Sequence, residues 1–279
     1  TVLNTGLLIT SDKPINAVYE IQNRVNSESY SLKGMNALGT EFIIPAQNTI
    51  NNFPYCDPPA RNSIAVVATE NQTTVKILPV ALMEGHPGLD TIFIQLNRGQ
   101  TWCGSALSPD STAHLGGTFV FADKPVAVTV TDDALRPKDA SGLSIDIAGD
   151  QVIPRHVASN EYLVAYLYAV SASNTLYIYA YENGTSVTVD GFLLGTINRG
   201  EEIRHEAVFP TSVSYITTNK PVLVYSFIKH ILFSTKEVAG QVCPPLTCAG
   251  SRKVTFCRTG PGLPSDDFWT FLVTRTENN

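Results

Sequence analysis

Three related stretches, ITSDKPINAV (9–18), VFADKPVAVT (120–129) and YITTNKPVLV (215–224), decide how this sequence folds. Each places a polar turn and Lys-Pro between two apolar runs. Proline has no N–H to donate and fits the first residue of a strand, and it holds the residue before it in an extended conformation. Ser, Asp, Thr and Asn before it favour turns because their side chains bond the local backbone. Each copy therefore predicts a hairpin made of a strand, a tight polar turn and a second strand.

Two further patterns alternate with the Lys-Pro stretches. The first is SIAVVATENQTTVKIL (63–78), which returns as TLYIYAYENGTSVTVD (175–190). The second is FIQLNRGQTW (93–102), which returns as LGTINRGEEI (194–203). In all four an Asn-containing turn lies between β-branched runs, and Asn and Gly tolerate the positive φ that tight turns need. These stretches also predict hairpins.

The patterns recur in the same order after roughly 100 to 110 residues, which indicates an internal duplication. A further match, ALGTEFIIP (37–45) with VASNEYLVA (157–165), follows the first two Lys-Pro copies. Period-2 alternation recurs throughout, and no long amphipathic helix interrupts it. We predict one all-β repeat domain over residues 1–279, with internal repeats at approximately 7–116, 117–210 and, in part, 211–279.

Two all-β architectures fit these repeats. If each hairpin and its following strands form a four-stranded blade of roughly 45–50 residues, about six blades would close into a β-propeller-like array. If each repeat closes on itself, the result is a pair of tandem β-sandwiches. We favour the propeller because the two hairpin types alternate at intervals near half a repeat.

Composition narrows the classes of partner. The sequence is 43% hydrophobic and 16% charged, with a net charge of -6 and no runs of like charge. Nucleic-acid binders cluster Lys and Arg against phosphates, so a nucleic-acid partner is not expected. The longest apolar stretch, LVAYLYAV (163–170), is too short to cross a bilayer, so no membrane insertion is expected. Because the chain starts at TVLNTG and ends in a polar tail, we expect it to be a fragment of a larger protein.

The cysteine spacing does not match a zinc site, since CPPLTC (243–248) has no second pair at ligand spacing. In an exported protein, Cys56 and Cys103 are the favoured disulfide, with Cys243 bonded to Cys248 or Cys257. The alternative is that several of the five thiols stay reduced.

The ordered motifs carry a resemblance to a known family. They are TSDKPINAVYE, GTEFIIP, VATENQTTVKI, LNRGQTW, FADKPVAVTV, YENGTSVTVDG and TTNKPVLVYSF. In this order they resemble the IgGFc-binding protein N-terminal domain family over roughly residues 7–228, and the chain looks like a bacterial secreted or surface member of it. The resemblance implies an extracellular, non-enzymatic adhesion or binding module, and in a mucus protein of the family this region is associated with binding of immunoglobulin G Fc.

Standard catalytic motifs are absent: the sequence has no HExxH, GxSxG, Walker loop or GxGxxG. The five histidines show no paired spacing, and we expect each on the surface or in a loop: His86, His114, His156, His205 and His230.

Acidic residues supply the candidate sites. One group, Asp132, Asp133, Asp139, Asp146 and Asp150, offers the hard oxygen ligands that calcium prefers, although a solvated loop is the simpler interpretation. Near the end of the chain, Asp266 and Asp267 precede Phe268 and Trp269, where an aromatic ring beside an acid could stack a sugar, or Trp269 could be core. The predicted ligand-binding residues are Asp132, Asp133, Asp139, Asp146 and Trp269, with calcium as a candidate cofactor.

The leading functional prediction is a non-enzymatic extracellular or cell-surface adhesion module that presents loops to a protein or glycan ligand, such as a mucin or an immunoglobulin. One alternative is a propeller-type glycan hydrolase or lyase using Asp132, Asp133, Asp146 and Asp266. Another is a structural spacer in a large surface protein. The predicted display loops are 46–62, 79–90, 103–116, 131–151 and 229–267.

Overall fold

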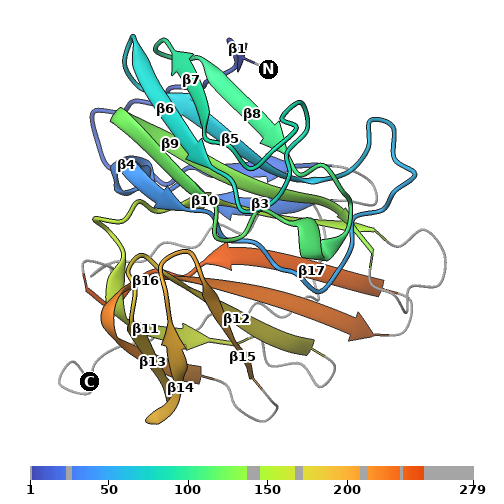
Figure 1. Ribbon diagram of the computed structural model, residues 1–279, viewed down its shortest axis with the longest axis vertical. Coiled ribbons are helices and arrows are strands. Elements are labelled where there is room, and N and C mark those ends of the chain that lie inside the picture. Colours follow the sequence, from blue (N-terminus) through green and yellow to red (C-terminus); the bar gives the residue numbers. More distant parts are fainter. Residues whose placement is uncertain are drawn as a thin grey trace.

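The computed structural model describes residues 2–22, 27–136, 145–166, 172–207, 213–232 and 235–247, and within these ranges the protein is all-β apart from two short 3-10 turns (Figure 1). None of the helices in these ranges has the length and apolarity that crossing a membrane requires. The elements are β1 (Val2–Leu3), β2 (Val18–Ile21), β3 (Glu28–Ser31), η1 (Gly34–Ala37), β4 (Leu38–Ile43), β5 (Asn62–Ala68), β6 (Thr73–Leu78), β7 (Ile92–Leu96), β8 (Thr101–Ser105), η2 (Ser111–Ala113), β9 (Phe119–Leu135), β10 (Asp146–Val152), β11 (Ser159–Ala165), β12 (Ala172–Ala180), β13 (Thr185–Val189), β14 (Phe192–Ile197), β15 (Glu202–Ala207), β16 (Val213–Leu232) and β17 (Thr235–Val242).

The strand pairings repeat. In the first unit, β4–β10, the long strand β9 pairs with β4 and β10 along one edge and with β6 and β5 along the other. In the second unit, β11–β17, the long strand β16 pairs in the same order with β11 and β17, and with β13 and β12. Outside the two units, β2 and β3 form a small hairpin, and β1 pairs with β8. The duplicated sequence patterns therefore fold into duplicated topology.

The prediction of a hairpin at each Lys-Pro motif is wrong. Asp123–Pro125 lies inside the single strand β9, and the corresponding residues 219–221 lie inside β16. Along β4, the pairing shifts from Gly39↔Val126 to Glu41↔Phe121, so the Lys-Pro segment bulges out of the ladder. A bulge bends a strand and increases its twist, so one strand can serve two halves of a bent sheet. The Lys-Pro motif is a strand corner.

The Asn-containing turns are corners as well. The strands on either side of the ENQT turn, β5 and β6, do not pair with each other but follow one another along β9, with Ala68↔Val126 and Val75↔Ala122. The NRG turn likewise joins β7, which pairs with β6, to β8, which pairs with β5. The three motifs therefore mark one line of bends across the unit. The Lys-Pro segment bends β9, the ENQT turn lies between β5 and β6, and the NRG turn lies between β7 and β8.

The alternating sequence LYIYAY (176–181) explains how the two units share a core. Leu176 and Ile178 face the second unit's own core, beside Val187 and Val224. The tyrosines between them point the other way, into a core that also contains residues of the first unit such as Phe42. Successive side chains on a strand point to opposite faces, so β12 is buried on both.

The all-β prediction is confirmed, and the propeller is not seen: the described ranges form two bent sheet systems and a hairpin, without an array of four-stranded blades around an axis. The pairings are compatible with the tandem alternative. The predicted repeat boundaries stay a prediction. Figure 1 shows β10, β3 and β17 together across the middle of the molecule, where the two units meet.

Candidate functional site

The three repeated motifs meet at one hydrogen-bonded corner in the first unit. Lys124 Nζ donates to the carbonyl oxygen of Asn71 at 2.6 Å. The side-chain oxygen of Asn71 accepts the backbone N–H of Arg98, and that of Asn97 accepts the backbone N–H of Gln72. Side chains thus satisfy backbone groups that the bends leave unpaired in the ladder.

The second unit repeats this network residue for residue. Lys220 Nζ donates to the carbonyl of Asn183, whose side-chain oxygen accepts the N–H of Arg199. Asn198 accepts the N–H of Gly184. The network accounts for the lysine and both asparagines of the repeated patterns as architectural residues.

The second corner packs against the first unit. The Arg199 guanidinium lies 4.4 Å from the ring centroid of Phe119, within range of a cation–π interaction. Gly117 has a φ of +91°, and a Cβ there would lie 2.5 Å from the carbonyl oxygen of Gly200. This close backbone approach requires glycine and brings β15 opposite the loops of the first unit.

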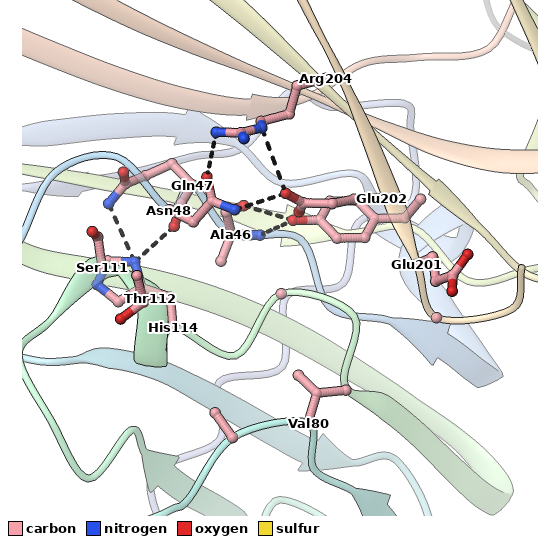
Figure 2. A pocket seen from close by; sticks show the side chains of 14 residues that line it. Ala46, Gln47, Asn48, Val80, Ser111, Thr112, His114, Glu201, Glu202 and Arg204 are labelled. Carbon is pink, nitrogen blue, oxygen red and sulfur yellow. Dashed lines mark hydrogen bonds and ion pairs between the residues drawn. The ribbon is translucent and has the colours of Figure 1, made fainter. Parts of the chain in front are cut away.

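A pocket of about 600 Å³ opens between the two units at this place (Figure 2). Three of the five predicted display loops line one side, through Gln47 and Asn48, Val80 and Ala81, and residues 111–116. The other side comes from residues 200–204 and Tyr179 of the second unit. The prediction for loop 131–151 is corrected in part, since it contains the end of β9 and nearly all of β10.

Three side chains form the charged wall of the pocket. Asn48 Nδ2 donates to Glu202 Oε1 at 2.7 Å, and Arg204 Nη1 donates to Asn48 Oδ1 at 3.1 Å. Arg204 Nε lies 4.0 Å from the same Glu202 oxygen. Figure 2 shows the amide between the two charges. The side chain of Arg204 is half exposed, and Asn48 accepts from one of its five N–H donors, so the guanidinium can bind a further acceptor.

Tyr179 forms the base of the pocket. Its hydroxyl donates to the carbonyl of Ala46 at 2.6 Å and accepts the N–H of Ala46 at 3.2 Å, which fixes the loop that carries Asn48. A Cβ on Gly116 would lie 2.6 Å from this hydroxyl, so the loop approaches it closely. Burial raises the pKa of Tyr179 well above its ordinary value, so the phenol stays protonated.

Behind the pocket lies a buried polar network centred on Asp132. Gln47 Nε2 donates to Asp132 Oδ2 and Asn52 Nδ2 to Asp132 Oδ1, both at 2.8 Å. His114 Nδ1 is 3.3 Å from Asp132 Oδ2 and 2.7 Å from the carbonyl of Gln47. Burial raises the pKa of Asp132, while His114 and the amide donors act to lower it. His114 lies in a loop, as expected, but its side chain is buried in this network and does not lie on the surface.

The other predicted aspartates do not converge on Asp132. Asp146 Oδ2 and Asp150 Oδ2 accept the N–H groups of Val238 and Val242, each at 2.7 Å, so they join β10 to β17. Asp133 is half-buried beside Arg61, whose carbonyl accepts its N–H at 3.3 Å. Within the described residues, no three His, Cys, Asp or Glu side chains are grouped so as to hold a metal ion. Asp139, Asp266, Asp267, Phe268 and Trp269 lie outside the described residues, and a calcium site there stays a prediction.

Three cysteines are free thiols in the structure, so the Cys56–Cys103 disulfide is not formed. Cys103 lies on β8 opposite Ala65, with an exposed side chain, and Cys56 lies in the loop before β5. Burial raises the pKa of the Cys243 thiol to about 12, which makes it unreactive. Its predicted partners Cys248 and Cys257 lie outside the described residues.

Sequence reasoning missed Asn48, Tyr179, Glu202 and Arg204. A signal was available in the comparison of the two NRG stretches. The first continues as QTWCG (100–104) and the second as EEIRH (201–205), so charged residues replace neutral ones at matching positions. Where matching strand positions are charged in one repeat and neutral in the other, the charged side chains are not needed by the shared framework and indicate a surface with a separate function.

The comparisons with curated proteins and with solved structures do not identify the fold. No curated protein matches the sequence. Among solved structures, an anti-sigma factor domain-containing protein from Clostridium clariflavum is 11% identical with a TM-score of 0.22, over 82% of this chain and 98% of that chain. A calcium-binding mutant of β-glucuronidase 2 from Bacteroides uniformis is 8% identical with a TM-score of 0.13, over 81% of this chain and 31% of that one. Both TM-scores are too low to indicate a shared fold.

The family comparison is of a different kind, because it covers most of the chain. The family model described as IgGFc binding protein matches residues 27–242, from the residue before β3 to the end of β17. It therefore spans both units and the pocket between them. The chain therefore belongs to the IgGFc-binding protein family.

Proposed function

We propose that the chain is a non-enzymatic extracellular binding module and that a protein ligand contacts it at the pocket between the two units. The observation that carries the proposal is the group Asn48–Glu202–Arg204, in which an amide lies between the two charges and Arg204 is half exposed. The group lies at a pocket lined by loops of the first unit and by β15 and Tyr179 of the second. The name of the family supports binding of a protein.

The chemistry of the pocket fits an acidic or amide-rich protein surface. Arg204 uses one of its donors on Asn48, and a guanidinium can hold a ligand carboxylate through two parallel N–H groups. Glu202 can accept from a ligand N–H. On the opposite wall, Val80 is 47% exposed and Ala81 lies beside it, which provides apolar contact area next to the charged wall. Arginine beside apolar surface is typical of residues that dominate binding energy.

The framework suits presentation of a rigid site. Tyr179 holds the loop of Asn48 through two hydrogen bonds, and the Asp132 network anchors the same loop at Gln47. Binding therefore needs little ordering of these residues, which lowers its entropic cost.

The carboxylates proposed for a glycan hydrolase or lyase lack a common cleft among the described residues. Asp132 is engaged with Gln47, Asn52 and His114, whereas Asp146 accepts from β17. Their hydrogen bonds already have structural roles, which favours binding over catalysis as the proposal. A structural spacer remains the competing possibility, and it predicts no ligand at the pocket.

Binding measurements on the whole chain test the proposal. Biolayer interferometry would compare the immunoglobulin G Fc fragment, purified mucin and an unrelated glycoprotein as ligands. Arg204→Glu should weaken the binding that is found by about tenfold or more, equivalent to ~1.4 kcal/mol, because it reverses the charge at the pocket mouth.

Arg98→Glu is the matched control. Arg98 is exposed and lies at the corner of the first unit, away from the pocket, so the same charge change there should leave affinity unchanged. If Arg204→Glu and Arg98→Glu bind the ligand with equal affinity, or if no protein ligand tested binds the chain, the proposed site is refuted.

A further inference from the structure

A largely buried lysine and aspartate meet where the β2–β3 hairpin contacts the first unit. The ammonium of Lys33 forms an ion pair with Asp150 Oδ1, and the two side chains are 21% and 4% exposed. The residues are 117 positions apart in the chain. Lysine and aspartate are rarely withdrawn from water in this way, because each charge loses its hydration. The pair therefore calls for an explanation beyond a surface ion pair.

Hydrogen bonds to three strands hold the two groups in place. Asp150 Oδ2 accepts the N–H of Val242 and Oδ1 accepts the N–H of Gln151, each at 2.7 Å. The backbone N–H of Lys33 donates to Gln151 Oε1 at 2.6 Å. The strands β3, β10 and β17 lie together in Figure 1. The contact between the ammonium and the carboxylate is thus built into the junction of these strands.

The second unit does without this pair. Counted back from the repeated segment that includes β4 and β11, Ile153 stands at the position of Lys33. By the register of β10 on β9 and of β17 on β16, Gln241 stands at the position of Asp150. The shared framework therefore does not require a lysine and an aspartate at these positions, which indicates a separate role for them.

The surroundings favour the uncharged forms of both groups. Burial lowers the pKa of Lys33 and raises the pKa of Asp150, while their mutual attraction opposes both shifts. An uncharged amine is a nucleophile, and an uncharged carboxyl group is the acyl group that it can attack. Lys33 Nζ contacts Oδ1, which is bonded to Cγ, so the nitrogen lies close to the carbon that it would attack. This proximity is what accelerates an intramolecular reaction.

A third carboxyl group lines the same pocket. Glu28 borders a cavity of about 350 Å³ together with Lys33 and Asp150. Its Oε1 accepts the N–H of Ser29, whereas its Oε2 is buried and has no hydrogen-bond partner among the described residues. Burial raises the pKa of Glu28 to about 7, so this group can both accept and donate a proton near neutral pH. The cavity also gives a released water molecule an exit.

We propose that Lys33 and Asp150 form an intramolecular amide cross-link, with Glu28 as the group that carries the proton. Glu28 takes a proton from the Lys33 ammonium, and the amine nitrogen attacks Cγ of Asp150. Oδ2 then receives the negative charge of the tetrahedral intermediate, at the position where the N–H of Val242 donates to it.

The second half of the reaction releases water. Glu28 returns its proton to Oδ1, the Cγ–Oδ1 bond breaks, and the oxygen leaves as water with two of the three ammonium protons. The third proton stays on the amide nitrogen. One ammonium and one carboxylate thus become one amide and one water, so atoms and charge balance without a co-reactant. The product ties the β2–β3 hairpin covalently to the first unit.

Mass spectrometry of the whole chain, denatured and reduced, tests the proposal. After incubation at neutral pH the chain should be lighter by one water molecule than its sequence requires. Digestion should release one species in which the peptide of Lys33 is joined to the peptide of Asp150. Lys33→Arg keeps the positive charge but lacks the amine, so it should have its full mass. Lys13→Arg, at an exposed lysine, is the matched control and should lose the water as the original chain does.

Glu28→Gln should slow the loss of water at least about tenfold, because an amide does not carry the proton. A full mass for the original chain would overturn the proposal. A water loss that persists in Lys33→Arg would also overturn it, because an aspartate cyclised onto its own backbone loses water without a lysine. Equal rates in Glu28→Gln and the original chain would overturn the role of Glu28. The mass of the original chain decides the main outcome, so the test does not depend on the folding of a variant.

Discussion

Asp132→Asn should destabilise the first unit strongly, although it changes few atoms. Both carboxylate oxygens of Asp132 accept an amide N–H, from Gln47 and Asn52, and the side chain is only 4% exposed. An asparagine must place its own NH₂ against one of these donors, whichever way the amide is turned. It also removes the negative charge beside His114.

The magnitude follows from the donor that loses its acceptor. One buried donor left without an acceptor costs about 1–3 kcal/mol, so we expect a loss of roughly 1–3 kcal/mol. Urea denaturation followed by Trp fluorescence suits the measurement, because Trp102 is buried in the first unit. Asp90→Asn, at an exposed position, is the control. A loss below about 1 kcal/mol would show that the network does not hold Asp132 as a paired carboxylate.

Two further changes test other parts of the fold. Burial raises the pKa of Glu28 from its ordinary value to about 7, so the folded chain holds a proton there that the unfolded chain releases near pH 4.5. The stability that this proton contributes is fully present below pH 4.5 and is lost as the pH rises towards 7. Glu28→Gln should remove this pH-dependent loss of stability in thermal unfolding scans across the range. A variant with the same pH profile as the original chain would contradict the raised pKa of Glu28. Lys124→Met should cost about 1 kcal/mol in urea denaturation by removing the bond to Asn71, whereas Lys13→Met, at the same position of the exposed stretch ITSDKPINAV (9–18), should cost nothing measurable. Equal effects of the two lysine changes would refute the corner role.

The sequence allowed the all-β class and the duplication to be predicted, because period-2 alternation and repeated corners are local patterns. The shape of the repeats could not be predicted in the same way. A polar turn such as Asp123-Lys124-Pro125 has the same composition whether the chain reverses or bends, and only the pairing of β4, β5 and β6 along β9 makes it a corner. The hairpin interpretation led to the propeller, because it counted each bent strand as two.

For the candidate site, the sequence predicted the loops that line the pocket but not the side chains at its mouth. Three of the predicted display loops meet at the pocket, since loops that join bent strands gather at the ends of a unit. The aspartates were assigned to ligand binding because a sequence shows charge and not burial. Asp132 and Asp146 instead bind groups of their own chain, and the side chains at the pocket mouth come from β15, a strand that sequence patterns marked as framework.

The pocket between the units is the central claim, and a footprint of the bound ligand tests it most directly. Hydrogen–deuterium exchange of the whole chain, with and without the immunoglobulin G Fc fragment, would locate the contact. The account predicts slower exchange in residues 46–48, 111–116 and 200–204, and loss of that protection in Arg204→Glu. Protection elsewhere on the chain, or identical exchange with and without the fragment, would contradict it.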